Sequence, residues 1–146
     1  MIVAVISTCL TAIGVCFAAW QIMESRIIAR TQFEDILDAQ YRSLMQKIPA
    51  DVFLESNPTR PNKQLNELFF NYYDLSNEQI FLRQQGRISD SRWECWSEGI
   101  RENMNLKEIN DFWEVVIAHD KSTDKTRFTM LSKFAANGYC EDPKNW

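Results

Sequence analysis

Residues 1–23 read MIVAVISTCLTAIGVCFAAWQIM and contain no Asp, Glu, Lys or Arg. A helix rises about 1.5 Å per residue, so a segment of this length reaches roughly 33 Å, which matches the bilayer hydrocarbon core of about 30 Å. Trp20 stands near one end of the segment, where an indole ring suits the headgroup level of a membrane. We therefore expect a single transmembrane helix over residues 1–23.

Three other interpretations of this segment are weaker. A cleaved signal peptide carries a basic region and a shorter apolar run, whereas here only Met1 precedes a long apolar run. A lipid-modified cysteine follows small residues, but Thr8 and Val15 precede Cys9 and Cys16. A buried helix of a water-soluble protein seldom runs this far without a charge. The membrane anchor is the favoured expectation.

The flanking charges predict the orientation of the span. Arg26, Arg30 and Arg42 follow it, and the positive-inside rule places such residues in the cytoplasm. We therefore expect the amino terminus outside and the remaining chain in the cytoplasm. Only Cys95 and Cys140 lie beyond the span, and two distant cysteines in a reducing compartment are expected to be free thiols.

The remaining sequence predicts an all-α fold, because its apolar residues recur at helical spacing and no strand alternation is present. Between Ala18 and Ile48 there is no proline or glycine, so the transmembrane helix is expected to continue into a long cytoplasmic helix. The helix predicted over residues 62–85 contains a capping-box pattern at Ser76 and Gln79, which is compatible with a break at that point. We predict helices over residues 2–47, 62–85, 89–103, 106–118 and 124–136. The expected organisation is a transmembrane helix (1–23), a helical extension (24–48), a loop with one short turn (49–61) and a small helical bundle that packs on the extension (62–146).

Composition and motifs argue against several function classes. The net charge is −4 and no basic block is present, so nucleic-acid binding is not expected. His119 is the only histidine, and one histidine with scattered cysteines does not make an ordinary zinc site. Trp93, Trp96 and Ile100 share one helical face and predict core rather than a ligand platform. Since known catalytic signatures are absent as well, we expect no enzyme activity, no metal and no cofactor.

The most site-like run is YYDLSNEQIFLRQQGR, which begins at Tyr72. Asp74, Asn77 and Glu78 fall at i, i+3 and i+4 of a helix predicted to be buried. Two carboxylates on one face repel each other unless a positive group pairs with them, and a nearby arginine such as Arg83 or a metal ion can do so. We expect a buried polar network at these three residues. A metal-dependent hydrolase using Asp74 and Glu78 is the second alternative function.

Within the expected span, Ser7, Thr11, Gly14 and Ala18 follow one another at steps of four, three and four residues. Small residues on one face let transmembrane helices approach closely. These four residues predict a helix-association face in the membrane. The alternative is that they face lipid and take no part in association.

Several stretches resemble a set of short bacterial single-span, membrane-anchored proteins of unassigned function. They are AAWQ at the end of the apolar span, ARTQFED after it, the block DLSNEQIFLRQQGRIS followed by a W..W..GI pattern, and a closing DP..W. Members are sometimes labelled as phage-defence proteins. The resemblance covers nearly the whole chain and implies the bacterial inner membrane as its location, but it brings no catalytic residues.

Together these observations predict a non-enzymatic accessory or scaffold subunit. It is expected to associate through its span, as a homo-oligomer or within a larger membrane complex, and to present its helical domain to a partner. The alternative is a membrane-acting phage-defence effector.

Overall fold

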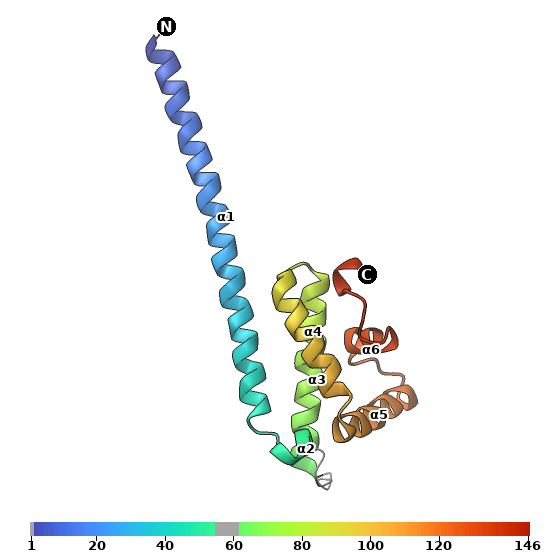
Figure 1. Cartoon of the computed structure of the whole chain (residues 1–146). Coiled ribbons are helices and arrows are strands. Elements are labelled where there is room, and N and C mark those ends of the chain that lie inside the picture. The colour runs from blue at the N-terminus through green and yellow to red at the C-terminus, as the bar shows by residue number, and fades with distance from the viewer. Residues whose placement is uncertain (1, 55–61) are drawn as a thin grey trace. The chain divides into compact units, whose positions relative to one another are not determined.

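The structure, a computed structural model, describes the backbone of residues 2–54 and 62–146 and the side chains of residues 13–54 and 62–146 (Figure 1). Every regular element in these ranges is helical, which confirms the predicted all-α fold. The elements are α1 (Ile2–Met45), α2 (Ala50–Leu54), α3 (Lys63–Gln84), α4 (Asp90–Met104), α5 (Lys107–Ser122), α6 (Thr129–Ala136) and the 3₁₀ helix η1 (Pro143–Asn145).

The chain divides into two compact units, Met1–Asp35 and Ile36–Trp146. We call the second one the helical unit. Large apolar side chains of the first unit are exposed along α1, including Ile13, Trp20 and Ile27. Within the part of the chain that the structure describes, none of the helices combines the length and the apolar composition that a membrane crossing requires. Residues 1–12 of the expected span lie outside the residues whose side chains are described.

Helix α3 forms the centre of the helical unit and packs against α5, α6 and η1. It begins at a side-chain cap, since Asn62 Oδ1 accepts a hydrogen bond of 2.8 Å from the amide of Leu65. The helix runs through Ser76 without a break. Ser76 is fully buried there, so the packing of its neighbours holds the helical backbone and overrides the capping pattern.

An aromatic cluster fills the space between α3 and α5. The ring of Tyr73, which is completely buried, lies 5.0 Å from the Trp113 ring and 6.0 Å from the Phe128 ring, centroid to centroid. Its hydroxyl donates a 2.5 Å hydrogen bond to the carbonyl of Ile109, and burial raises the pKa of this hydroxyl. Aromatic pairs at such separations add to the stability gained from apolar burial.

The helix ends follow the sequence closely in three places. Ser89 caps α4 by accepting a hydrogen bond from the amide of Arg92. Gly86 (φ +67°) and Gly138 (φ +65°) follow α3 and α6 in the left-handed conformation, in which glycine avoids the steric cost of a Cβ atom. The predicted inner stripe of α4 is confirmed, because Trp93 and Ile100 are buried.

Two predicted boundaries are wrong, because α5 ends at Ser122 and not at Ala118, and α6 begins at Thr129 and not at Asp124. Asp124 has a left-handed backbone (φ +52°), which cannot open a right-handed helix. The residue instead ends α5, whose C-terminal turn is closed by a 3.0 Å hydrogen bond from the Lys125 amide to the Asp120 carbonyl.

Asn77 caps α6 from another helix, and its removal should destabilise the unit. Its Oδ1 accepts hydrogen bonds from the amides of Met130 (3.0 Å) and Leu131 (3.1 Å), while the N-cap residue of α6, Phe128, supplies no side-chain cap. Asn77→Ala is expected to lower the free energy of unfolding by about 1 kcal/mol. Chemical denaturation followed by tryptophan fluorescence measures the loss. Asp74→Ala is the control, since Asp74 lies exposed on the same helix; equal losses in both variants would contradict the capping role.

Candidate functional site

The structure separates the three residues of the predicted buried polar network. Asp74 and Glu78 are exposed, so the prediction is wrong for both of them. Their spacing puts them on the outer side of α3, whereas Ser76 and Arg83 are buried on its inner side. Asn77 is half-buried, and its side chain caps the start of α6.

The predicted helix-association face is described only in part. Gly14 and Ala18 are exposed on α1, and a side chain at Gly14 would meet no described atom beyond the adjoining backbone of its own helix. Ser7 and Thr11 lie outside the residues whose side chains are described. The association face stays a prediction.

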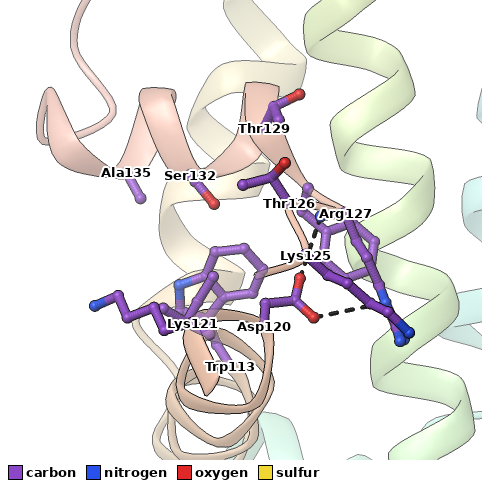
Figure 2. A pocket seen from close by; sticks show the side chains of 11 residues that line it. Trp113, Asp120, Lys121, Lys125, Thr126, Arg127, Thr129, Ser132 and Ala135 are labelled. Carbon is purple, nitrogen blue, oxygen red and sulfur yellow. Dashed lines mark hydrogen bonds and ion pairs between the residues drawn. The ribbon is translucent and has the colours of Figure 1, made fainter. Parts of the chain in front are cut away.

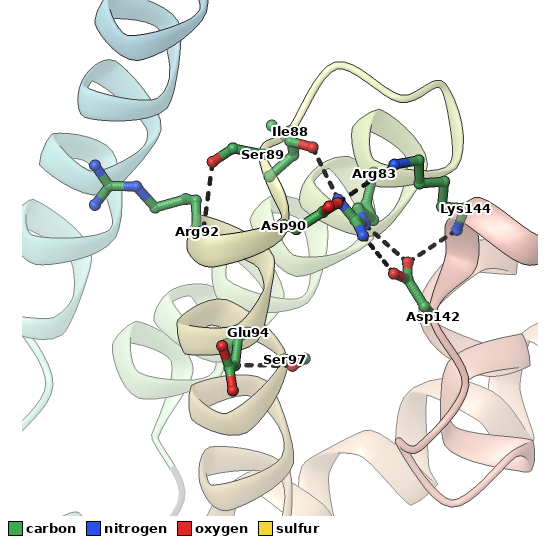
Figure 3. A network of polar contacts seen from close by, with 9 residues as sticks. All are labelled: Arg83, Ile88, Ser89, Asp90, Arg92, Glu94, Ser97, Asp142 and Lys144. Atoms are coloured by element: carbon green, nitrogen blue, oxygen red, sulfur yellow. Dashed lines mark hydrogen bonds and ion pairs between the residues drawn. The ribbon is translucent and has the colours of Figure 1, made fainter.

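The buried polar network of the helical unit is centred on Arg83, whose side chain is only 3% exposed. Its Nη1 donates to the carbonyl of Ile88 at 2.9 Å and to Asp90 Oδ1 at 2.7 Å. Its Nε donates to Asp142 Oδ1 at 2.8 Å, and its Nη2 pairs with the other oxygen of the same carboxylate. Figure 3 shows the acceptors Asp90, at the start of α4, and Asp142, in the C-terminal segment, converging on Arg83 of α3. The fork geometry of a guanidinium makes such bidentate pairing strong.

The C-terminal segment supplies the second half of this network. Asp142 is the N-cap of η1 and accepts a 3.0 Å hydrogen bond from the amide of Lys144, and Pro143 at the first helical position is buried. Aspartate before proline is a typical helix start. Lys144 Nζ also lies 3.3 Å from Asp90 Oδ1. The network therefore fastens the last residues of the described chain to α3 and α4.

This network predicts a loss of stability in acid. The hydrogen bond from Arg83 lowers the pKa of Asp142 below its ordinary value of 3.8, and it lowers that of the exposed Asp90 in the same direction. Because both folded-state pKa values lie below the unfolded ones, their contribution is fully present above about pH 4 and is lost as the pH falls further. Denaturant titrations across this range should show a steeper loss in the wild type than in Asp142→Asn; parallel curves would contradict the assignment.

A second polar contact ties the end of α1 to α4 within the helical unit. The indole Nε1 of Trp96 donates a 2.7 Å hydrogen bond to Asp38 Oδ1, and Arg92 pairs with Asp38 Oδ2. Nearby, Asn103 Nδ2 donates to the Tyr41 hydroxyl at 3.0 Å. Residues 36–48 of the expected helical extension lie in the helical unit, so these contacts are internal to that unit.

A pocket of about 460 Å³ lies between α5, the 123–128 connection and α6 (Figure 2). The buried ring of Trp113 and the buried carboxylate of Asp120 line it. Exposed cations, among them Lys121 and Lys125, stand around it. The sequence did not point to this pocket, because its residues come from two helices and a connection without a common period.

No cluster of three or more His, Cys, Asp or Glu side chains suited to a metal ion occurs among the described residues. His119 is exposed. Cys95 and Cys140 are free and exposed thiols, as predicted.

No protein-family model, curated protein or solved structure matches this chain.

Proposed function

We propose that this protein is a single-span, inner-membrane accessory subunit without enzyme activity of its own. Its amino terminus lies outside and its helical unit lies in the cytoplasm. It associates through the span, either with copies of itself or with a larger membrane complex, and the helical unit contacts the partner.

The observation that carries this proposal is the absence of Asp, Glu, Lys and Arg from residues 1–23. A charged residue at the bilayer centre costs about 2.5–3.5 kcal/mol on insertion scales, so a run of this length without charge suits lipid. In water, the exposed apolar side chains of α1, such as Val15 (64%) and Phe17 (54%), would promote aggregation. A bilayer or a partner helix would cover them.

The helical unit supports the scaffold part of the proposal. Arg83, Asp38 and Asn77 each make contacts that join separate helices. Polar groups placed in this way rigidify a fold and specify one packing arrangement. A rigid helical body on an anchor suits a scaffold that holds a partner at the membrane.

Purification of the full chain from native membranes in a mild detergent tests this function. We expect a reproducible complex larger than the monomer, with its other components identified by mass spectrometry. Gly14→Leu should reduce the recovered complex severalfold, because a bulky side chain prevents close helix approach. Val15→Leu, one position away, is the matched control and should leave the complex intact.

Two outcomes would contradict the accessory role. A lone monomer in mild detergent would remove the partner on which the role depends. Growth arrest on expression that disappears in Gly14→Leu would instead support a membrane-acting effector.

A further inference from the structure

The part of α1 that follows the expected span keeps one side of the helix free of charge. The charged residues between Ile22 and Ser43 are Glu24, Arg26, Arg30, Glu34, Asp35, Asp38 and Arg42. When the chain is written as heptads with Ile22 at position a, these charges occupy positions b, c, e, f and g, and none falls at a or d. In every other heptad frame at least one of these charges falls at a or d, so the charges select a single frame.

The residues at a and d in this frame form what we call the α1 seam. They follow one another at alternating steps of three and four residues, the spacing of a coiled-coil contact line. All of them are exposed, and the side chains of Ile22 and Ile36 are 55% and 56% exposed. Burial of two such isoleucines against a partner helix is favourable. The seam consists of Ile22, Ser25, Ala29, Gln32, Ile36, Ala39 and Ser43.

The helical unit uses the other side of α1. Leu37 is buried, Asp38 accepts the hydrogen bond from an indole of α4, and the Tyr41 hydroxyl accepts one from an amide of the same helix. These residues occupy positions b, c and f, which lie on the outer side of a coiled coil. Ile36 and Ala39, between them in the sequence, are exposed. The packing of the helical unit therefore leaves the seam accessible to a partner.

The chemistry of the seam fits a second copy of the same helix. β-Branched residues at position a favour parallel two-stranded coiled coils, and one polar residue in the contact line sets the register. Ile22 and Ile36 occupy a positions, and Gln32 is an amide that can hydrogen-bond to its own counterpart. The flanking pairs of positions g and e in a parallel dimer contain no two like charges; they are Gln21 with Arg26, Ile28 with Phe33, and Asp35 with Gln40.

We propose that the α1 seam pairs with the same seam of a second copy in a parallel two-stranded coiled coil. The parallel direction rests on the proposed function, because both spans enter the membrane from the same side. Ala18 of the predicted association face occupies the preceding d position, so the coiled coil continues that face into the cytoplasm. The inference names the partner that the accessory role left open between a second copy and another protein.

Disulfide formation in native membranes tests this pairing in the full chain, after its four cysteines are replaced by serine. Ser25→Cys, Ala29→Cys and Gln32→Cys are introduced one at a time and oxidised in air with a copper catalyst. A disulfide needs Cβ atoms about 3.5–4.5 Å apart, so each seam variant should give about fivefold more linked dimer than the controls. The controls are Ile27→Cys and Thr31→Cys, at the outer positions f and c of the same exposed stretch.

Linkage at all three seam positions identifies a parallel pair in register, since antiparallel helices bring like residues together at one level only. Equal yields at seam and control positions, or no linked dimer at any of them, would overturn the proposal. The accessory role would survive that result if the complex purified in mild detergent still contained other proteins. Conversely, seam linkage in a chain recovered from the soluble fraction would support the pairing and contradict the membrane role.

A charge placed in the seam gives a second test. Ile36→Lys should lower the dimer yield of the Ala29→Cys chain about tenfold, because it buries two like charges against each other. Ile27→Lys is the matched control, since Ile27 is equally exposed (60%) but lies outside the seam, and it should leave the yield unchanged. Circular dichroism checks that both variants fold. Equal yields in the two lysine variants would contradict the seam.

Discussion

Replacing Tyr73 by Ala is expected to destabilise the helical unit by about 3–5 kcal/mol, the range for deleting a large buried aromatic side chain. Tyr73 is completely buried, and its ring contacts the rings of Trp113 and Phe128. The substitution also removes the buried hydrogen bond to the Ile109 carbonyl. Urea denaturation of the full chain, followed by tryptophan fluorescence, measures the loss.

Phe81→Ala is the control for this prediction. Phe81 lies on the same helix, but 44% of it is exposed, so its truncation should cost about 0.5–1 kcal/mol. If the two variants lost similar stability, the aromatic cluster around Tyr73 would not be the core of the unit. A Tyr73→Phe variant separates the two contributions, and it should lose only about 1 kcal/mol for the missing hydrogen bond.

Asp142→Ala is expected to cost about 2–3 kcal/mol, because it leaves a buried cation without its bidentate partner. The side chain of Arg83 is 3% exposed, whereas that of Asp142 is 30% exposed. In the variant, Asp90 and the Ile88 carbonyl still bind Arg83, so the loss stays below that of a wholly unpaired charge. The last described residues should also detach, and limited proteolysis near η1 would detect this.

A double-mutant cycle distinguishes this pairing from simple loss of packing. Arg83→Met fills the buried space with an apolar side chain, and the remaining carboxylate can be hydrated where it is exposed. Arg83→Met should therefore cost less than Asp142→Ala, and adding Asp142→Ala to it should cost little more. Additive losses would contradict a direct energetic coupling between the two residues.

Most of the fold could be predicted from the sequence, because helical periodicity and helix-end signals agree along the chain. Trp93 and Ile100 were assigned to the core from their spacing alone, and they are buried. The helix predicted over residues 62–85 ends just before Gly86, which has a positive φ. The start of α6 was missed because the left-handed backbone of Asp124 has no strong signal in a residue other than glycine.

The polar network was predicted at the wrong residues for a physical reason. The run containing Asp74 and Glu78 concentrates charge, but charge concentrated in sequence often marks the exposed face of a helix. Arg83 lies seven residues after Ser76 and therefore on the buried face of α3. A cation on that face was the sequence feature that indicated the position of the polar network. Its partner, Asp142, lies 59 positions away, a distance that periodicity cannot bridge. Only the Asp-Pro helix start at the end of the chain hinted at a structural role there.

We propose that residues 1–23 hold the protein in a membrane. Fractionation of bacteria that express the full chain at a low level tests it directly, with alkaline carbonate washing of the membrane pellet. We predict that the intact chain, confirmed by mass spectrometry to retain its first residues, stays in the washed pellet and leaves it only with detergent. Recovery of the intact chain in the supernatant, or of a chain that has lost its leading segment, would contradict the claim.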